Sequence, residues 1–442
     1  MIKLLWSKGQ APLVIDPRED EAREGTVVSS DIARILSAQG LRAAAYGFTS
    51  VLLGASLEAE GWSGAQVGGL LTAIVAGTAL TSYAVGRYGD RLGRRRTYAL
   101  LFLGLTASGA VFGVTESFWL LVAVSLTGTL STEIVESGPF TSLEQVMLPA
   151  VVEGRHTRIF GTYNAIATLM GSLGALAAGG PELLRDVWPG APANHRFFLL
   201  LVPVGLIGAA LASSLSERAE DGRRPDEQTP PLQRSRNRVV RLSALFALDS
   251  FAGGFVIQSF IAYWFARRFG ASPELLGVIF FGVGIFQSLS FVVATRLGER
   301  IGLLNTMVFT HLPSNILLAI IPLAPSLPVA VALLMARFSL SQMDVPTRQA
   351  YVVAMVDPEE RTAAAAYTNG ARNLVRPLGP LLAGLSQQFA FGAPFVVGGG
   401  LKAIYDLVLW RWFRTVPLGS EAKVSERDEL AHNKQQEGKV AP

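Results

Sequence analysis

The chain has 442 residues, of which 50% are hydrophobic and only 16% are charged, and its mean hydropathy is +0.38. A soluble protein carries about 25% charged residues, so this composition excludes a single water-soluble core and indicates a membrane protein. Cysteine is absent, which excludes disulfides and thiolate metal sites. Four histidines without HxxH or HExxH spacing argue against a zinc site, and a net charge of +4 argues against nucleic-acid binding.

A membrane-spanning helix needs about 20 mostly apolar residues. The first 33 residues predict a polar cytoplasmic tail, because their apolar run is too short for a signal peptide. Twelve apolar segments follow, and we expect each of them to be a transmembrane helix. They lie at 34–57, 64–86, 97–115, 118–138, 157–180, 196–215, 242–266, 273–295, 302–323, 326–345, 360–388 and 392–413.

A long polar segment at 216–241 divides the twelve apolar segments six and six and predicts a flexible cytoplasmic linker. It separates an N-terminal half at 34–215 from a C-terminal half at 242–413, and a polar tail follows at 414–442. Lys and Arg concentrate in the loops on the side of the two termini, which predicts that both termini are cytoplasmic in a plasma (inner) membrane. The outer turns carry only Arg185, Arg196, Arg267 and Arg268.

The two halves resemble each other in sequence. The matches are LRAAAYGF at Leu41 with LDSFAGGF at Leu248, GDRLGRRRT at Gly89 with GERIGLLNT at Gly298, and EQVMLPAVVEGRHTRIFGTYNA at Glu144 with RQAYVVAMVDPEERTAAAAYTNG at Arg348. Three matches in the same order indicate an internal repeat. Parallel repeats related by an axis along the membrane normal are a known transporter plan, with the binding site between the halves near the midplane.

The loop between the second and third segments contains GRYGDRLGRR, from Gly86 to Arg95. It resembles the G-x-x-x-D-R-x-G-R-[RK] signature of the major facilitator superfamily at all six defining positions. The run FGTYNAIATLMGSLGALAAG also resembles that family's fifth helix. The resemblance covers residues 31–415. It implies an all-α integral membrane protein with twelve transmembrane helices in two six-helix pseudo-repeats, around a cavity that opens alternately to each side.

We expect this motif to form a gate. Gly86 and Gly93 permit a tight turn between two helix ends. Asp90 can lie at the positive N-terminus of a helix from the other half, such as the one starting near Glu360, and so lock the cytoplasmic side shut. The basic residues of the motif can pair with nearby carboxylates or with anionic lipid headgroups, or they can serve topology alone. They are Arg91, Arg94, Arg95 and Arg96.

Ionisable side chains inside a membrane are costly, and we take them as functional hypotheses. In the repeat alignment Arg42 is equivalent to Asp249, and Glu133 is equivalent to Arg337. We therefore expect Arg42 to pair with Glu133, and Asp249 with Arg337. Either these pairs are structural, or Glu133 or Asp249 exchanges its arginine for a proton during transport. Glu136 is expected on the same helix face as Glu133, where it is either a second proton carrier or part of a solvated mouth.

Arg372 and Arg376 are four residues apart in the eleventh segment, so they lie on one helix face. Two guanidinium groups on one face can clamp a carboxylate or a phosphate. The alternative is that they pair with Asp344 or Glu136.

Other polar side chains in the apolar segments have separate interpretations. Gln258 and Gln287 have aromatic neighbours in the sequence and can line a cavity for an organic molecule. Lys402 and Asp406 are expected to pair within the twelfth segment. His311 is expected to form an interhelix hydrogen bond rather than a ligand site.

These patterns favour a proton-coupled secondary transporter that works by alternating access and exports small organic molecules. The direction rests on the family resemblance. One alternative is an importer or exchanger of an anionic metabolite held by Arg372 and Arg376, and another is a non-transporting membrane sensor. No nucleophile–base pair or metal constellation is visible, so we expect neither an enzyme nor a cofactor. The expected partners are a small-molecule substrate, the lipid bilayer and protons, and we expect a monomer.

Overall fold

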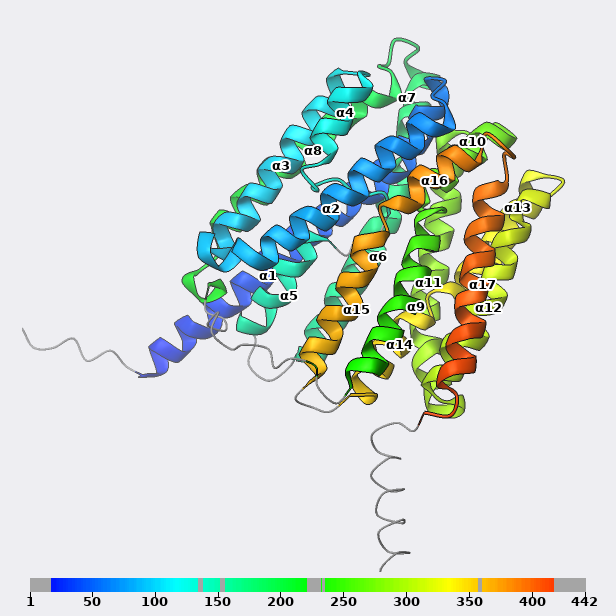
Figure 1. Cartoon of the computed structure of the whole chain (residues 1–442). Helices are drawn as coiled ribbons and strands as arrows, with labels where there is room; N and C mark the ends of the chain where they lie inside the picture. Colours follow the sequence, from blue (N-terminus) through cyan, green and yellow to red (C-terminus); the bar gives the residue numbers. More distant parts are fainter. Residues whose placement is uncertain are drawn as a thin grey trace, which may run out of the picture.

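A computed structural model of the chain describes residues 17–133, 138–151, 156–220, 232, 235–356 and 360–416. Within these ranges the regular structure is helical and contains no strand, which confirms the all-α fold (Figure 1). The α-helices are α1 (Pro17–Ala59), α2 (Gly64–Leu92), α3 (Arg94–Val114), α4 (Phe118–Ser125), α5 (Pro139–Val151), α6 (His156–Ala177), α7 (Gly180–Val187), α8 (Leu201–Ser213), α9 (Arg236–Gly254), α10 (Gln258–Phe269), α11 (Pro273–Ile301), α12 (Leu303–Ile320), α13 (Leu327–Ser341), α14 (Asp344–Ala354), α15 (Arg361–Val375), α16 (Leu378–Ser386) and α17 (Ala393–Phe413). The 3-10 helices are η1 (Asn194–Leu200), η2 (Glu217–Ala219) and η3 (Ile321–Leu323).

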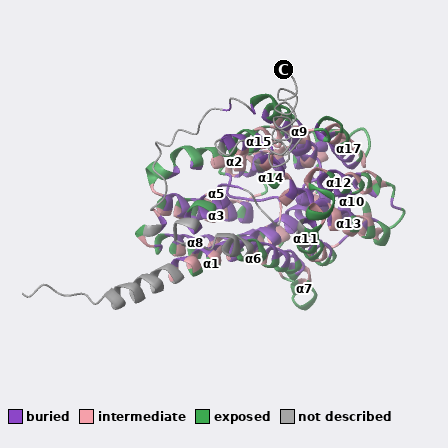
Figure 2. Ribbon diagram, turned by 90° about the horizontal axis from the view of Figure 1, so that it is seen from below, coloured by how far each residue is buried: buried purple, intermediate pink, exposed green. Residues whose placement is uncertain are grey.

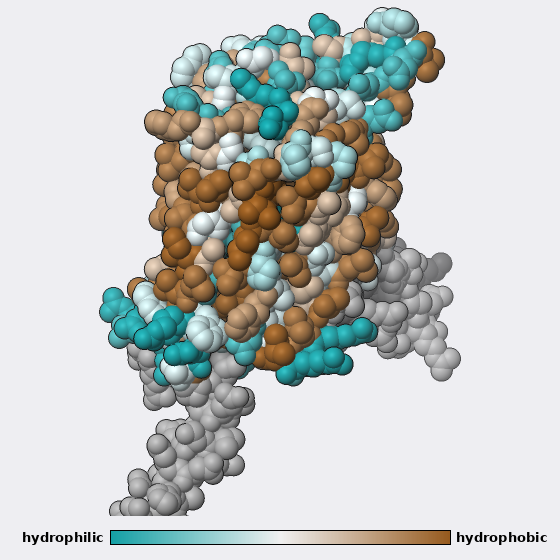
Figure 3. Space-filling model, turned by 90° about the vertical axis from the view of Figure 1, so that its right-hand side faces the viewer, coloured by the Kyte–Doolittle hydropathy of each residue, from teal (hydrophilic) through white to brown (hydrophobic). Residues whose placement is uncertain are grey.

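An apolar band crosses the surface of the helix bundle. Figure 3 shows a band of hydrophobic residues across the middle of one face, with hydrophilic residues at both ends. Seven described spans are long and apolar enough to cross a membrane: Gly64–Leu92, Arg94–Val114, Asn194–Ser213, Arg236–Phe269, Pro273–Ser290, Leu303–Leu323 and Ala393–Phe413. Seen from the end where the chain begins and ends, buried residues face the interior of the helix bundle and exposed residues face outward (Figure 2). This is the pattern of a multi-pass membrane protein.

The helix boundaries differ from the sequence expectation at several places. Helix α1 begins at Pro17, inside the predicted polar tail, because the run PREDEAREG is rich in good helix formers. Two predicted single helices each consist of two helices, α9 with α10 and α15 with α16. The predicted segments 118–138 and 326–345 contain the shorter helices α4 and α13, and α5 and most of α14 lie beyond their predicted ends. Pro139 starts α5, and Pro377 separates α15 from α16, because proline lacks the N–H that continues a helix. Most of the predicted linker and C-terminal tail lies outside the described residues.

The break between α4 and α5 decides where Glu133 lies. At Gly128 the backbone has a φ of +69°, and a Cβ there would lie 2.3 Å from the carbonyl oxygen of Gly77 on α2. Only glycine fits this close approach and this backbone conformation without strain. The chain therefore leaves α4 as a non-helical segment against α2 instead of continuing as the predicted helix.

Backbone carbonyls in this non-helical segment are satisfied by side chains and backbone groups of neighbouring helices. The bonds run from Thr81 Oγ1 to the carbonyl of Thr127 (2.9 Å), from the Tyr46 hydroxyl to that of Thr129 (2.6 Å), from Thr78 Oγ1 to that of Leu130 (3.4 Å), and from the backbone N–H and hydroxyl of Ser259 to that of Thr132 (3.2 Å each). Non-helical backbone at membrane depth requires such partners. The segment is thus held in place, and Glu133 with it.

The helices pack in two sets. The first set, α1 to α8, is held together by packing of α1 on α6 and α8 and of α3 on α8. The second set, α9 to α17, is held together by packing of α9 on α15 and of α12 on α13 and α17. The sets meet through α1 with α10, α2 with α16 and α6 with α11 (Figure 1). We call the end where α1 starts and α17 finishes the terminal end, and the opposite end the distal end.

Close backbone packing joins the two sets toward the distal end. A Cβ on Gly68 of α2 would lie 2.5 Å from the carbonyl oxygen of Pro380, and a Cβ on Gly384 of α16 would lie 2.1 Å from that of Gly64. Small residues that let backbones approach this closely are typical of helix contacts in membranes. Helices α2 and α16 are therefore in direct contact.

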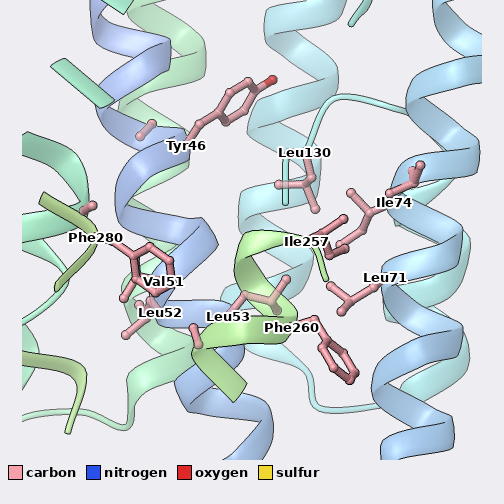
Figure 4. Close-up of a cluster of buried hydrophobic side chains, with 14 of the residues drawn as sticks. Tyr46, Val51, Leu52, Leu53, Leu71, Ile74, Leu130, Ile257, Phe260 and Phe280 are labelled. Atoms are coloured by element: carbon pink, nitrogen blue, oxygen red, sulfur yellow. The ribbon is translucent and has the colours of Figure 1, made fainter. Parts of the chain in front are cut away.

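Apolar side chains complete this contact. Figure 4 shows Ile257, which precedes α10, and Phe260 of α10 next to Leu53 of α1 and to Leu71 and Ile74 of α2, and these five side chains are buried. They belong to one continuous hydrophobic cluster that spans both sets. A dry apolar contact of this kind excludes water, so the distal side of the interface is sealed.

Hydrogen bonds also cross the sealed region. They run from Gln258 Nε2 to Ser50 Oγ (3.0 Å), from the Tyr263 hydroxyl to the carbonyl of Trp62 (3.0 Å) and from Arg267 Nη1 to the same carbonyl (3.2 Å). Near the terminal end, by contrast, the charged side chains of α5 and α14 pair within their own sets, Glu144 with Arg42 and Asp344 with Arg348. The two sets are thus joined toward the distal end and at the middle of the interface.

Candidate functional site

An ion pair at the middle of the interface joins the two sets. Arg376, at the end of α15, contacts Glu133, and the distance from Nη2 to Oε1 is 2.7 Å. The side chains are 27% and 34% exposed, so water reaches both. Glu133 lies in the non-helical segment and not on the continuous helix that the sequence predicts for Glu133 and Glu136. Glu136 lies outside the described residues.

A buried charged cluster lies within the first set. Arg42 on α1 pairs with Glu144 on α5, with 2.7 Å between Nη2 and Oε2. Glu144 is completely buried and also accepts hydrogen bonds from the hydroxyls of Tyr98 and Tyr163. The predicted Arg42–Glu133 pair is therefore wrong. Helix α5 begins at Pro139, directly after the predicted fourth segment ends, so Glu144 is not among the intramembrane charges that the sequence predicts.

A second buried cluster centres on Asp249 of α9. Lys402 Nζ lies 2.6 Å from its Oδ1, and Arg372 Nη1 and Arg348 Nη1 lie 3.4 and 3.6 Å from its Oδ2. His311 Nε2 lies 3.9 Å from Oδ1. The carboxylate is 4% exposed, so its charge must be compensated inside the protein. The predicted Asp249–Arg337 pair is wrong, because four other basic side chains surround Asp249.

Neighbouring polar side chains extend this cluster. Asp344 pairs with Arg348 one turn later on α14, with 2.5 Å between Oδ2 and Nη1, and not with Arg372 or Arg376. Asp406 bonds to His311 Nδ1 (2.9 Å) instead of pairing with Lys402, which corrects the predicted pair within the twelfth segment. The same bond confirms the expected interhelix role of His311. It joins α12 to α17.

Arg337 on α13 has an unusual environment. The residue is only 7% exposed, and its Nε and Nη1 atoms are buried without a hydrogen-bond partner. Its guanidinium carbon lies 4.5 Å from the ring centre of Phe338. Among the described residues no carboxylate oxygen comes within 4 Å of it, although Glu133 is near enough to act on it electrostatically. Arg337 is therefore a buried cation whose charge is incompletely compensated.

The two glutamines predicted to line a cavity have different environments. Gln258 is buried and bonds to Ser50 across the interface between the sets. Gln287 on α11 is half-buried. Gln258 therefore contributes to the sealed interface, and its role as a ligand-contacting residue stays a prediction.

The motif between α2 and α3 does not make the expected contact with the other set. Asp90 is half exposed and bonds to Arg94 four residues later, with 2.7 Å between Oδ1 and Nε. Gly93 has a φ of +87°, which a glycine turn permits. The backbone N–H groups of Arg94 and Arg95 donate to the carboxylate of Glu220, so the start of the linker caps α3.

The remaining motif residues have different environments. Arg91 and Arg96 are exposed, and Arg95 Nη2 bonds to the carbonyl of Ser213 on α8 (2.9 Å). A Cβ on Gly86 would meet nothing within 4 Å, so packing does not require glycine there. Glu360, near which Asp90 was expected, accepts a bond from the N–H of Ser235.

A cluster that the sequence spacing did not predict lies at the distal end of the first set. His195 Nδ1 in η1 lies 3.3 Å from Glu116 and 3.6 Å from Glu60. The three ligand atoms lie within 4.8 Å of one another, which could hold a divalent cation. Burial, together with the charge of Glu116, raises the pKa of Glu60 to about 7. These three residues are far apart in the sequence, so no local motif predicts the cluster.

Comparison with known proteins decides the family. The Major Facilitator Superfamily model matches residues 35–263 and 243–440, which together span most of the chain. The chain belongs to the Major Facilitator Superfamily. This confirms the resemblance of the motif between α2 and α3, and it makes the protein a membrane transporter with the all-α fold of the superfamily.

Individual relatives within the superfamily are distant. An uncharacterized membrane protein of Saccharomyces cerevisiae, YJR124C, is 24% identical over 436 residues, covering 90% of this chain and 96% of that protein. An uncharacterized MFS-type transporter of Bacillus subtilis, YceJ, is 22% identical over 389 residues, covering 85% and 91%. The solved structure of the nucleoside transporter NupG is 12% identical with a TM-score of 0.67, covering 87% of this chain and 99% of that chain. At this identity the likeness shows the fold alone.

Proposed function

We propose that the protein is a proton-coupled transporter that exports small organic molecules by alternating access of the two helix sets. The Glu133–Arg376 ion pair is the observation that carries this proposal, because it is a solvent-accessible carboxylate–guanidinium pair between the two sets. The distal contacts among α1, α2, α10 and α16 close one side of the interface. If both termini are cytoplasmic, the closed distal end faces outward, and this arrangement is the inward-facing state of the transporter.

Proton uptake supplies the coupling step in this proposal. When a proton binds Glu133, the carboxylate becomes neutral and its attraction for Arg376 is lost. The contact between the sets at the middle of the interface then weakens, which favours movement of one set against the other. Asp249 is a poorer candidate, because Lys402 and Arg348 hold its charge inside the second set.

An importer or exchanger of an anionic metabolite is the second candidate. Arg372 favours it, because its only ion pair within the described ranges is a long contact of 3.4 Å with Asp249, which Lys402 already binds at 2.6 Å. The Arg372 side chain is also partly exposed, so a ligand can reach it. Arg376 is bound to Glu133, so a ligand would have to compete for it.

Reconstitution in proteoliposomes tests the proposal. An imposed pH gradient should drive flux of a labelled compound against its concentration gradient, screened over neutral, cationic and anionic organic molecules. Proton-coupled export predicts flux opposite to the proton gradient and its loss on adding a protonophore. If neither the pH gradient nor the protonophore changes the flux of any transported compound, proton coupling is removed from the proposal.

A further inference from the structure

The buried guanidinium of Arg337 lacks the partners that a buried charge requires. Two of its three side-chain nitrogens, Nε and Nη1, are shielded from solvent and make no hydrogen bond within the part of the chain that the structure describes. Buried charges are paired and hydrogen-bonded in stable proteins, because removing an ion from water is costly. In the middle of a membrane protein such a residue points to an ion or ligand that completes its environment.

The other arginines in this region are compensated by protein carboxylates. Arg376 bonds to Glu133 at 2.7 Å, Arg348 to Asp344 at 2.5 Å, and Arg372 contacts Asp249. Glu133 also acts electrostatically on Arg337, so one carboxylate faces two guanidinium groups. Among the described residues, Glu133 is thus the one carboxylate that acts on Arg337, and it is already bound to Arg376.

We propose that Arg337 binds the negatively charged group of the transported molecule, so that the substrate is a small organic anion bearing a carboxylate or a phosphate. Guanidinium groups recognise both groups through paired N–H donors. The inference rests on the anion-transporter candidate given under the proposed function. It changes the expected anion-binding residue, because Arg372 and Arg376 contact carboxylates whereas Nε and Nη1 of Arg337 have no partner among the described residues.

The position of Glu133 links this site to the proton. Protonation of Glu133 neutralises the one described carboxylate that acts on Arg337, so the affinity of Arg337 for an anionic ligand increases. Binding of the proton and binding of the anion should therefore favour each other. This is the coupling of a symporter, so the inference supports the importer of an anionic metabolite over the exporter.

The test is thermal unfolding of the purified full chain in a neutral detergent free of phospholipid. The probes are benzoate, phenyl phosphate and the neutral benzamide at matched concentrations. We expect benzoate or phenyl phosphate to raise the Tm of the wild type by several degrees, and benzamide to leave it unchanged. Which of the two anions acts identifies the charged group of the substrate.

Two variants locate the binding group. Arg337→Met removes an uncompensated buried charge, so it should have a higher Tm than the wild type without ligand and should lose the response to the anions. Arg268→Met, at the exposed end of α10, is the matched control and should respond like the wild type. Arg337→Lys keeps the charge but not the planar fork, and should respond more weakly.

Three outcomes would overturn the inference. The first is a lower Tm or loss of folding in Arg337→Met, because either would reveal a protein partner for Arg337. The second is an anion response that Arg337→Met retains. The third is a wild type whose Tm responds to neither anion. Failure of the proposed function is distinguishable, because it would appear as anion binding to Arg337 without proton-driven flux in proteoliposomes.

Discussion

Arg42 and Glu144 form a buried ion pair with 2.7 Å between Nη2 and Oε2. In the repeat alignment their positions correspond to those of Asp249 and Arg348, whose Oδ2 and Nη1 atoms lie 3.6 Å apart. The two repeats thus place an ion pair at the same position and exchange the signs of the charges. In the first repeat the carboxylate is held further by Tyr98, whose hydroxyl lies 2.6 Å from Glu144 Oε1.

Removing one member of this pair should destabilise the protein strongly. Arg42→Met leaves Glu144 charged and buried, which should cost about 3–5 kcal/mol of the free energy of unfolding. The double variant Arg42→Met/Glu144→Gln leaves no charge unpaired and keeps an acceptor for Tyr98, so it should regain most of the loss. Chemical unfolding in detergent measures both. Arg96→Met, an exposed change on α3, should stay within about 0.5 kcal/mol of the wild type. A double variant as unstable as the single one would contradict the pair.

Asp90→Asn should impair transport while leaving stability nearly unchanged. The Asp90 side chain is 49% exposed, while that of Arg94, four residues later, is buried. Because water reaches the carboxylate, we expect this i,i+4 pair to contribute only about 0.3–0.5 kcal/mol. If Asp90 acts in the closure of the terminal end, as the sequence motif predicts, turnover in proteoliposomes should fall far more than the Tm does. If Asp90→Asn has the turnover and the Tm of the wild type, the gate hypothesis is contradicted.

Neutralising Glu133 and neutralising Asp249 should have different effects. Glu133→Gln should abolish flux driven by a pH gradient and preserve counterflow, which needs no net proton movement, because Glu133 is accessible to water. Asp249→Asn should lower the Tm and reduce counterflow as well, because Lys402 and Arg348 lose their buried partner. Gradient-driven flux that survives in Glu133→Gln would assign the proton to another group.

The contact between α2 and α16 should respond to a larger side chain. Gly384→Val places atoms where the carbonyl oxygen of Gly64 lies, so it should separate the sets at the distal end. The chain has no cysteine, so spin labels at Gln66→Cys and Gln388→Cys report their distance without further changes. We expect a longer and broader distance distribution in Gly384→Val. Gly400→Ala on α17, where a Cβ meets nothing within 4 Å, should leave the distance unchanged.

Glu60 should make stability depend on pH when a chelator keeps metal away. Its pKa is about 7 in the folded protein against an ordinary value of 4.5, so the protonated carboxyl favours folding. This stabilisation is complete below pH 4.5 and is lost as the pH rises through 7. Glu60→Gln is neutral throughout and should therefore exceed the wild type in Tm at about pH 8 but not near the ordinary pKa of 4.5. Glu299→Gln, exposed at the end of α11, should show no such difference, and identical pH profiles for Glu60→Gln and wild type would refute the prediction.

The sequence by itself determined the fold class, the family and many of the charges inside the membrane, although not Glu144 or Arg348. Hydropathy predicts each membrane helix from its own segment, because a helix in lipid pairs its backbone N–H and C=O groups internally. The motif from Gly86 to Arg95 is likewise local, because the turn that it forms needs only its own residues. The alignment of the repeats also identified Arg42 and Asp249 as equivalent positions, which the exchanged ion pairs make physically meaningful.

Only the tertiary structure decided which charges meet. Glu133 was assigned to Arg42 on the assumption of a continuous fourth helix, but the left-handed Gly128 ends that helix and directs Glu133 to Arg376 on the other set. Helix α5 then brings Glu144 to Arg42. The cluster of Glu60, Glu116 and His195 depends in the same way on three connections that meet in space. A pairing depends on the relative depth and rotation of two helices, and both are set by packing and by breaks such as the one at Gly128, which carry no periodic signal in the sequence.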